Sequence, residues 1–350
     1  MASESGKSKR EIFERQINLL KHNFEKTTLL FLKKRKPKEI DKWIFSRDDL
    51  PKFGKEYWFI HLASTNKSSK DQMILTFGHS EGNMAVNGFS VDSINQKNKS
   101  ACVIWAYQGK KIPISNSVSS LILNKNCLET NNRIVKMKFA GNYPDYMLKL
   151  ENKKKVIASI RLFGSRSKEK SYEFIETFRG IFGFELINLH LDFAGNLNNK
   201  KIQGKALVQK VIATGPFMPW RWGRIVFNDG SILSFFKLQM GGKRLNYTIK
   251  SSAYFYNGKT EETIRFNGIS VRELIAKKLW LIQSDDKKLS LLLEPYSSEF
   301  FKLESRGMIE YQEYLVNVKH IKIKAKKSEI DINMLGGGMG ILENTIGHMI

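Results

Sequence analysis

The segment at 204–238 reads GKALVQKVIATGPFMPWRWGRIVFNDGSILSFFKL and joins two halves of the chain that both carry strand patterns. Its PWRWG cluster (219–223) begins a segment with the apolar pattern of a strand. A turn at 228–230 separates this strand from a second predicted strand. Alternate residues of a strand share one face, so Trp220 and Trp222 point the same way. Two indoles on one face can wall an apolar chamber, or they can form an ordinary core pair.

The same two-residue period extends over nearly the whole chain after residue 55. Apolar residues alternate with Lys and other polar residues in runs such as 135–139, 146–150 and 156–162. This period is typical of half-buried antiparallel strands. In the second half it predicts strands at 220–227, 232–238, 245–256, 262–267, 278–283, 289–294 and 311–324. The pattern therefore predicts an all-β barrel or sandwich protein.

Two segments depart from this period. Aromatic residues at four-residue steps within 165–183 predict a short helix. The glycine-rich segment 336–340 lacks the G-K-[ST] ending of a phosphate loop, so we expect its glycines to let the terminal strand bend.

The chain is strongly basic. Its 350 residues include 58 Lys and Arg against 34 Asp and Glu, a formal charge of +24. A positive electrostatic field of this size favours anionic partners, either nucleic acid or an anionic bilayer. A general bias toward lysine in the composition would give the same charge. Apolar residues at helical spacing within 10–36 predict a basic amphipathic helix, which could lie on a membrane surface or pack on its own domain.

The sequence favours a cytoplasmic protein. Its two cysteines, Cys102 and Cys127, have no metal-ligand spacing, which is typical of a reducing compartment. The N-terminal residues show no secretory signal, and we expect no transmembrane helix. Peripheral attachment to a membrane through residues 10–36 is a further expectation.

Three segments resemble a family of two-barrel, lipocalin-like proteins that includes the carotenoid hydratases (hydroxyneurosporene synthases). They are EYWFIHL at 56–62, the WRWG and Asp-Gly pattern of the central segment, and GILENTIG at 340–347. The Pro-Trp pattern at 219–222 is also similar to tocopherol cyclase. The resemblance covers residues 55–350 and implies two consecutive lipocalin-like antiparallel β-barrels, which would follow the amphipathic helix predicted from helical spacing. The expected limits are 1–45 for the tail and helix, 46–214 for the first barrel and 215–350 for the second.

The resemblance also implies a barrel cavity for a long apolar ligand such as an isoprenoid or carotenoid. In the hydratases, an aspartate on the strand after the position resembling Gly204 is implicated in protonating a carbon–carbon double bond. The matching position here is Gln209, whose amide could orient a ligand or water but has no proton of useful acidity. Hydratase chemistry would therefore need another acid.

A carboxylic acid can protonate an alkene when an apolar pocket keeps it neutral. The candidate catalytic residues are Glu56, Asp192 and Glu343. Glu56 lies among aromatic residues, but it could instead pair with an arginine. Asp192 follows His190 by two residues, so the two share one strand face and could form a dyad.

The predicted ligand-binding residues surround the same motifs: Trp58, His61, Gln209, Trp220, Trp222 and Arg224. Arg224 shares the tryptophan face and could bind a ligand anion or pair with Glu56 or Glu343. His61 and His79 could meet across a hairpin, but no third ligand is evident, so we predict no metal site. We also predict no cofactor.

Three functions remain open from the sequence. The first is binding of a hydrophobic ligand, with or without hydratase, lyase or isomerase chemistry. The second is a non-catalytic basic β-protein that binds an anionic surface or nucleic acid; Tyr254 and Tyr256 alternate on a strand as stacking residues do, but no nucleic-acid motif accompanies them. The third is a scaffold with filled barrels.

Overall fold

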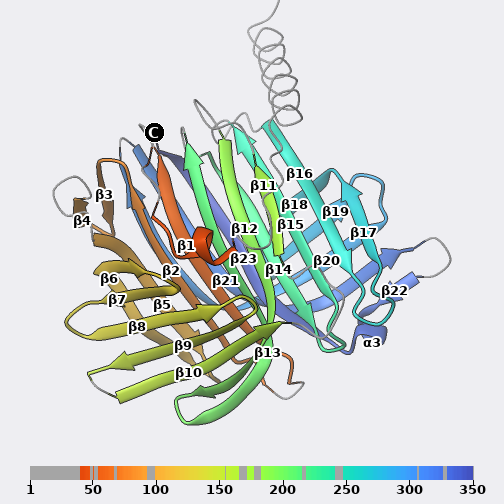
Figure 1. Ribbon diagram of the computed structural model, residues 1–350. Helices are drawn as coiled ribbons and strands as arrows, with labels where there is room; N and C mark the ends of the chain where they lie inside the picture. The colour runs from red at the N-terminus through yellow and green to blue at the C-terminus, as the bar shows by residue number, and fades with distance from the viewer. Residues whose placement is uncertain are drawn as a thin grey trace, which may run out of the picture.

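The computed structural model describes residues 40–47, 50, 54–66, 69–92, 99–153, 155–164, 172–176, 183–214, 218–240, 247–305, 307–325 and 329–349. The helix predicted at 10–36 lies outside these residues. Within them, no helix is long and apolar enough to cross a membrane. Strands dominate the described chain (Figure 1), which confirms the predicted all-β class.

The first sheet closes into an antiparallel barrel. Its strands follow the order β10-β9-β8-β7-β6-β5-β2-β1-β13-β12-β11, and a direct pairing of β10 with β12 closes the ring. The strands are β1 Lys55–Ser64, β2 Gln72–Ser80, β5 Lys99–Tyr107, β6 Lys111–Asn124, β7 Cys127–Asn131, β8 Val135–Asn142, β9 Asp145–Asn152, β10 Lys155–Gly164, β11 Tyr172–Glu176, β12 Gly183–Leu197 and β13 Lys200–Thr214. The short helix α2 (Ile40–Ile44) packs into the core of this barrel.

The second sheet is also antiparallel, but no pairing between its end strands β17 and β18 occurs in the described residues. Its main order is β17-β16-β15-β14-β23-β21-β20-β19-β18, and its two end strands are consecutive in the chain, joined at Gly268, where φ is +75°. Its elements are β14 Trp220–Phe227, β15 Ile232–Met240, β16 Tyr247–Tyr256, β17 Thr263–Asn267, β18 Ile269–Leu274, the 3-10 turn η2 Ile275–Lys277, β19 Leu279–Ser284, β20 Leu289–Glu304, β21 Gly307–Lys324, β22 Glu329–Asp331, α3 Ile332–Leu335 and β23 Gly338–Met349. A hairpin from the first half, β3 Asn83–Val86 and β4 Phe89–Asp92, adds to it by pairing with β20.

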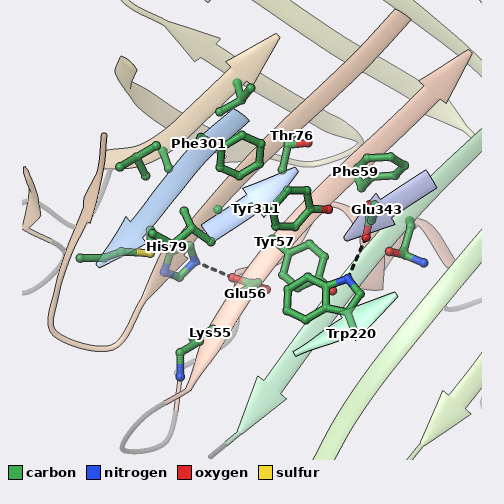
Figure 2. Close-up of a pocket in the computed structure, with 17 residues that line it drawn as sticks. Lys55, Glu56, Tyr57, Phe59, Thr76, His79, Trp220, Phe301, Tyr311 and Glu343 are labelled. Atoms are coloured by element: carbon green, nitrogen blue, oxygen red, sulfur yellow. Dashed lines mark hydrogen bonds and ion pairs between the residues drawn. The ribbon is translucent and has the colours of Figure 1, made fainter. Parts of the chain in front are cut away.

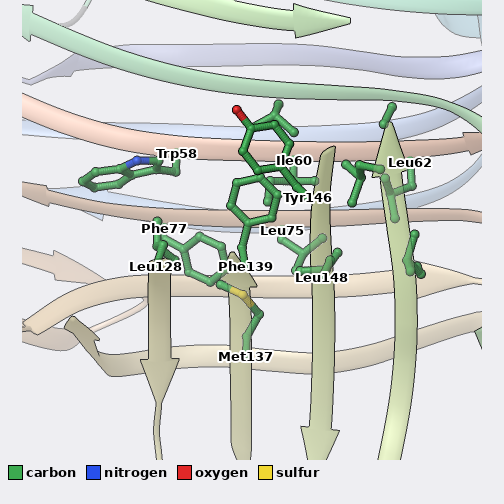
Figure 3. Packing of buried hydrophobic residues seen from close by; sticks show 14 of the residues in the cluster. Trp58, Ile60, Leu62, Leu75, Phe77, Leu128, Met137, Phe139, Tyr146 and Leu148 are labelled. Atoms are coloured by element: carbon green, nitrogen blue, oxygen red, sulfur yellow. The ribbon is translucent and has the colours of Figure 1, made fainter. Parts of the chain in front are cut away.

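Apolar side chains occupy both barrels and the space between them. The first barrel packs Trp58, Leu75, Phe77 and Phe139 against one another (Figure 3). A second cluster fills the other barrel. A third cluster lies between the sheets and takes side chains from both, including Phe59 and Trp105 of the first and Trp220, Trp222 and Ile341 of the second. The tryptophan face of β14 therefore points out of its own barrel, toward the first one.

The strand predictions agree with the structure within a few residues at most ends. Two segments differ more. Strand β20 continues to Glu304, well beyond the predicted end at 294. Within 165–183, residues 172–176 form strand β11 instead of a helix, because they pair with β12; the rest of that segment lies outside the described residues, apart from Gly183 at the start of β12. The glycines at 336–340 have two local roles, and a bend of the terminal strand stays a prediction. Gly336 ends α3 in the left-handed conformation, and a side chain at Gly340 would collide with the backbone oxygen of Arg224.

Candidate functional site

A cavity lies between the two barrels rather than inside either one. Its volume is about 80 Å³. Figure 2 shows its wall, to which strands β1, β2, β5 and β13 contribute from one sheet and β3, β14, β20, β21 and β23 from the other. Its lining is mainly apolar and aromatic, including Tyr57, Phe59, Met84, Val86, Ala101, Val103, Trp220, Phe301, Leu303 and Tyr311, and it holds two carboxyl groups, those of Glu56 and Glu343.

Glu343 is a carboxyl group without a cationic partner among the described residues. Its Oε2 accepts a hydrogen bond of 2.9 Å from Nε1 of Trp220, and the hydroxyl of Tyr311 also favours the charged form of the carboxyl. Only 6% of its surface is exposed, and this burial raises the pKa of Glu343 to about 7. The group is therefore a neutral acid in slightly acidic solution.

Glu56 also lines the cavity, from the other sheet, but its environment is the opposite of that of Glu343. Its Oε1 lies 2.8 Å from Nζ of Lys210, and its Oε2 lies 2.7 Å from Nε2 of His79. Burial alone would raise the pKa of Glu56, but the hydrogen bond from His79 and the charge of Lys210 together hold it below its ordinary value. Glu56 is thus ionised and does not fit the neutral acid that the sequence suggested.

His79 accompanies Glu56 on the cavity wall, because the two residues lie directly opposite each other on β1 and β2. Burial lowers the pKa of His79 more than the neighbouring carboxylate raises it, so the imidazole is neutral. Since a carboxylate only accepts hydrogen bonds, Nε2–H of His79 donates to Glu56 and Nδ1 keeps its lone pair. A carboxylate that fixes the tautomer of a histidine in this way prepares it to act as a base.

Lys210 connects Glu56 to the N-terminal part of the described chain. Its ammonium group is fully buried and donates to the backbone oxygens of Trp43 and Ser46, each at 2.8 Å. It also lies over the rings of Trp43 and Trp58, 4.9 and 5.1 Å from their centroids. The buried charge of Glu56 is therefore compensated by a lysine that α2 and the segment after it hold in place.

Two of the predicted ligand-binding residues line the cavity, Gln209 and Trp220. The amide of Gln209 donates to Oδ1 of Asn188 at 2.8 Å. Trp58 is not a cavity residue, because its indole lies inside the first barrel and its Nε1 donates to the backbone oxygen of Ile44 at 2.8 Å.

The other predicted residues are also away from the cavity. His61 is buried between the sheets against Gln72, at 2.7 Å, where burial and the charge of Arg224 lower its pKa to about 3. Arg224 is buried on the tryptophan face, and Trp222 packs against Phe59. None of the three belongs to the lining.

Asp192 does not join a dyad with His190. Its carboxylate forms an ion pair of 2.8 Å with Lys205, the residue opposite it on β13, and it lies outside the cavity. In the described parts of the chain, no group of three potential metal ligands comes together. His61 and His79 do not meet across the hairpin either, since the residue opposite His61 is Ile74.

Several residues of the site were not predicted from the sequence. Lys210, Tyr311 and Phe301 come from strands whose positions in space depend on pairing between distant segments. One signal was present: Tyr311 and Leu315 alternate with polar residues on β21, and Glu313 falls on their buried face. A carboxyl at a core position of a strand is uncommon and points to a site.

No family model matches the sequence, and no curated protein matches it. Among solved structures, one from Nitrosomonas europaea, assigned provisionally as AttH, aligns over 84% of this chain and 92% of its own, with 13% identity and a TM-score of 0.52. CghA in complex with Sch210972 aligns over 84% and 88%, with 8% identity and a TM-score of 0.46. Kievitone hydratase of Nectria haematococca aligns over 84% and 89%, with 10% identity and a TM-score of 0.35. The first of these similarities confirms the fold that the sequence motifs implied.

Proposed function

We propose that the cavity between the barrels binds a hydrophobic, isoprenoid-like ligand and that Glu343 protonates one of its carbon–carbon double bonds. The observation that carries this proposal is a carboxyl group with a pKa of about 7 on an aromatic wall, with no cation paired to it among the described residues. The chemistry is that of a hydratase, lyase or isomerase. Glu343 takes the role of acid that the resemblance assigns to the position of Gln209.

The first step moves the proton of Glu343 to an alkene carbon and leaves a carbocation on the neighbouring carbon. The aromatic faces of Tyr57, Trp220 and Tyr311 suit this cation, because aromatic rings attract positive charge over their faces. The new carboxylate of Glu343 keeps the hydrogen bond from Trp220, which strengthens as its charge develops, and the hydroxyl of Tyr311 also stabilises that charge.

The second step belongs to the opposite wall. Nδ1 of His79, oriented by Glu56, accepts a proton from water while the water oxygen bonds to the cation, and the product is an alcohol. If His79 instead takes a proton from a carbon next to the cation, the double bond moves and the product is an isomer. When the same groups act in the reverse direction, they eliminate water from an alcohol and form the alkene.

The test uses isoprenoid probes in deuterated water. Wild-type protein incubated with geraniol, farnesol or lycopene is expected to place deuterium on an alkene carbon, detected by mass spectrometry, and to release a bound lipid on extraction with organic solvent. Glu343→Gln should keep the probe bound but lose the deuterium transfer, because an amide has no acidic proton. Glu294→Gln is the matched control, because that side chain pairs with Lys319 at the surface.

Two results would contradict the proposal. One is the absence of any co-purifying lipid together with no quenching of tryptophan fluorescence by the three probes. The other is deuterium transfer by Glu343→Gln at the wild-type rate, which would assign the acid to a different residue.

A further inference from the structure

Three glutamates form a row across the second sheet. Glu299 on β20 lies directly opposite Glu313 on β21, and Glu313 lies directly opposite Glu343 on β23. Side chains at directly opposite positions of antiparallel strands share one face, with Cβ atoms about 5 Å apart. The row therefore runs along the face that meets the first barrel.

The row leads from the protein surface to the cavity. At its outer end, the carboxylate of Glu299 is partly exposed and pairs with Nζ of Lys111 at 2.8 Å. At its inner end, Glu343 lines the cavity. Glu313 stands between them, has no exposed surface and is not part of the cavity lining.

Glu313 has an oxygen that its surroundings leave without a partner. Its Oε2 accepts a hydrogen bond of 2.7 Å from Nε1 of Trp105, a residue of the first barrel. Its Oε1 has no hydrogen-bond partner among the described residues. Buried polar atoms are almost always paired, so a buried carboxyl that stays half-satisfied calls for an explanation. Glu343 is the neighbouring carboxyl on the same face.

Both inner members of the row carry protons near neutral pH. Burial first, and then the charge of Glu343, raises the pKa of Glu313 to about 8. The other ionisable side chains on this face are Lys111 at the outer end, Tyr57 and Tyr311 at the inner end, and the buried Arg224, which lies two residues along β14 from Trp222, the residue opposite Glu343. A protonated carboxyl in the middle of such a row can donate its proton on one side and accept one on the other.

We propose that Glu299, Glu313 and Glu343 form a proton relay that recharges the acid of the cavity from the side away from the ligand. The relay rests on the proposed function of Glu343. After Glu343 gives its proton to the alkene, Glu313 passes its own proton to the Glu343 carboxylate. Glu313 then regains a proton from solvent through Glu299, so each carboxyl returns to its starting state.

An apolar ligand makes the relay necessary. A ligand that fills a cavity of about 80 Å³ displaces the water that would otherwise reach Glu343. The row provides a second route whose entrance, the Lys111–Glu299 pair, lies outside the cavity lining. Trp105 and Trp220 each hold one buried carboxyl of the row through an indole N–H, which fixes the two groups while leaving their other oxygens to exchange protons.

The test follows hydrogen–deuterium exchange of the two buried carboxyl groups by infrared spectroscopy of the full chain without ligand, at a pH below 7. Each protonated carboxyl gives a C=O band that shifts on deuteration, and Glu343→Gln and Glu313→Gln assign the bands. The measurement is repeated in an Ala101→Phe background, which places an aromatic ring in the cavity in place of a ligand. In that background, Glu313→Gln is expected to slow exchange at Glu343 by at least an order of magnitude.

Glu299→Gln is the second variant, since it alters the entrance without touching the buried pair. It should slow exchange at both buried carboxyls and remove neither band, whereas Glu294→Gln should change nothing. Unchanged exchange at Glu343 in both Glu313→Gln and Glu299→Gln would overturn the relay while leaving the acid role of Glu343 intact. Absence of a protonated Glu343 band below pH 7 would instead overturn the proposed function itself.

Discussion

The indole of Trp222 meets the ring of Phe59 edge-on, with ring centroids 5.6 Å apart and planes at 88°. Trp222 belongs to the second sheet and Phe59 to the first, and both side chains lie outside the barrel of their own sheet. The contact therefore joins the two barrels face to face. Because the cavity lies in the same interface, each barrel supplies one wall: His79 and Glu56 come from one, and Glu343 comes from the other.

Truncation of Trp222 tests the energetic importance of this contact. Trp222→Ala removes an aromatic side chain from the interface and is expected to lower the free energy of unfolding by about 2 kcal/mol or more, measured by urea denaturation. Phe300→Ala is the control, because Phe300 on β20 is 42% exposed and should cost little. Equal losses for the two variants would contradict an interface role for Trp222.

The raised pKa values of Glu313 and Glu343 predict how stability depends on pH. Folding lifts both from an ordinary value of 4.5, to about 8 and about 7, so the folded state binds these protons more tightly than the unfolded chain does. Their contribution to stability is therefore complete below about pH 4.5 and is lost as the pH rises through 7 and 8. We expect the Tm of the wild type to fall over this range.

The double variant Glu313→Gln, Glu343→Gln should show a flatter dependence of Tm on pH, because neither amide titrates. Differential scanning calorimetry at several pH values measures the effect. A wild-type Tm that rises between pH 5 and 8 would mean that other groups dominate and that the two carboxyls are ionised in the folded state.

Local patterns in the sequence predicted the strands and their faces. The two-residue period at 135–139 and 220–227 gave strands close to the observed β8 and β14, because alternation records which side chains are buried. It also placed Trp220 and Trp222 on one face. The period does not say what covers that face, which here is the other barrel rather than a chamber inside the second one.

Contacts between distant segments decided the chemistry of each carboxyl. Glu56 was a candidate acid because aromatic residues flank it in sequence, but the ammonium group of Lys210 on β13 compensates its buried charge. Glu343 was among the candidate acids, while Glu313 was not, and only the register of β20, β21 and β23 aligns them with Glu299. Such a register is set by pairing across the sheet and leaves no local sequence signal.

Removal of Lys210 tests the ion pair at Glu56. Lys210→Met leaves a buried carboxylate without its cation, which is expected to cost about 3–5 kcal/mol of unfolding free energy. The double variant Lys210→Met, Glu56→Gln removes both charges and should recover much of this loss. Guanidinium denaturation measures both values, and a double variant no more stable than the single one would show that the bonds from Lys210 to Trp43 and Ser46 matter more than its charge.

Burial raises the pKa of Glu343, and the indole of Trp220 opposes this rise. Its N–H donates to the carboxyl at 2.9 Å and stabilises the ionised form, so Trp220→Phe should raise the pKa of Glu343 above about 7. Titration of the protonated-carboxyl infrared band measures the shift. Trp222→Phe is the matched control, because Trp222 lies directly opposite Glu343 on the same face, but its indole packs edge-on against Phe59 while the hydrogen bond to the carboxyl comes from Trp220. Deuterium transfer to a bound isoprenoid should then persist to higher pH in Trp220→Phe, since the acid stays protonated longer. An unchanged or lowered pKa would mean that Trp220 holds Glu343 in its neutral form and that Tyr311 stabilises the charge.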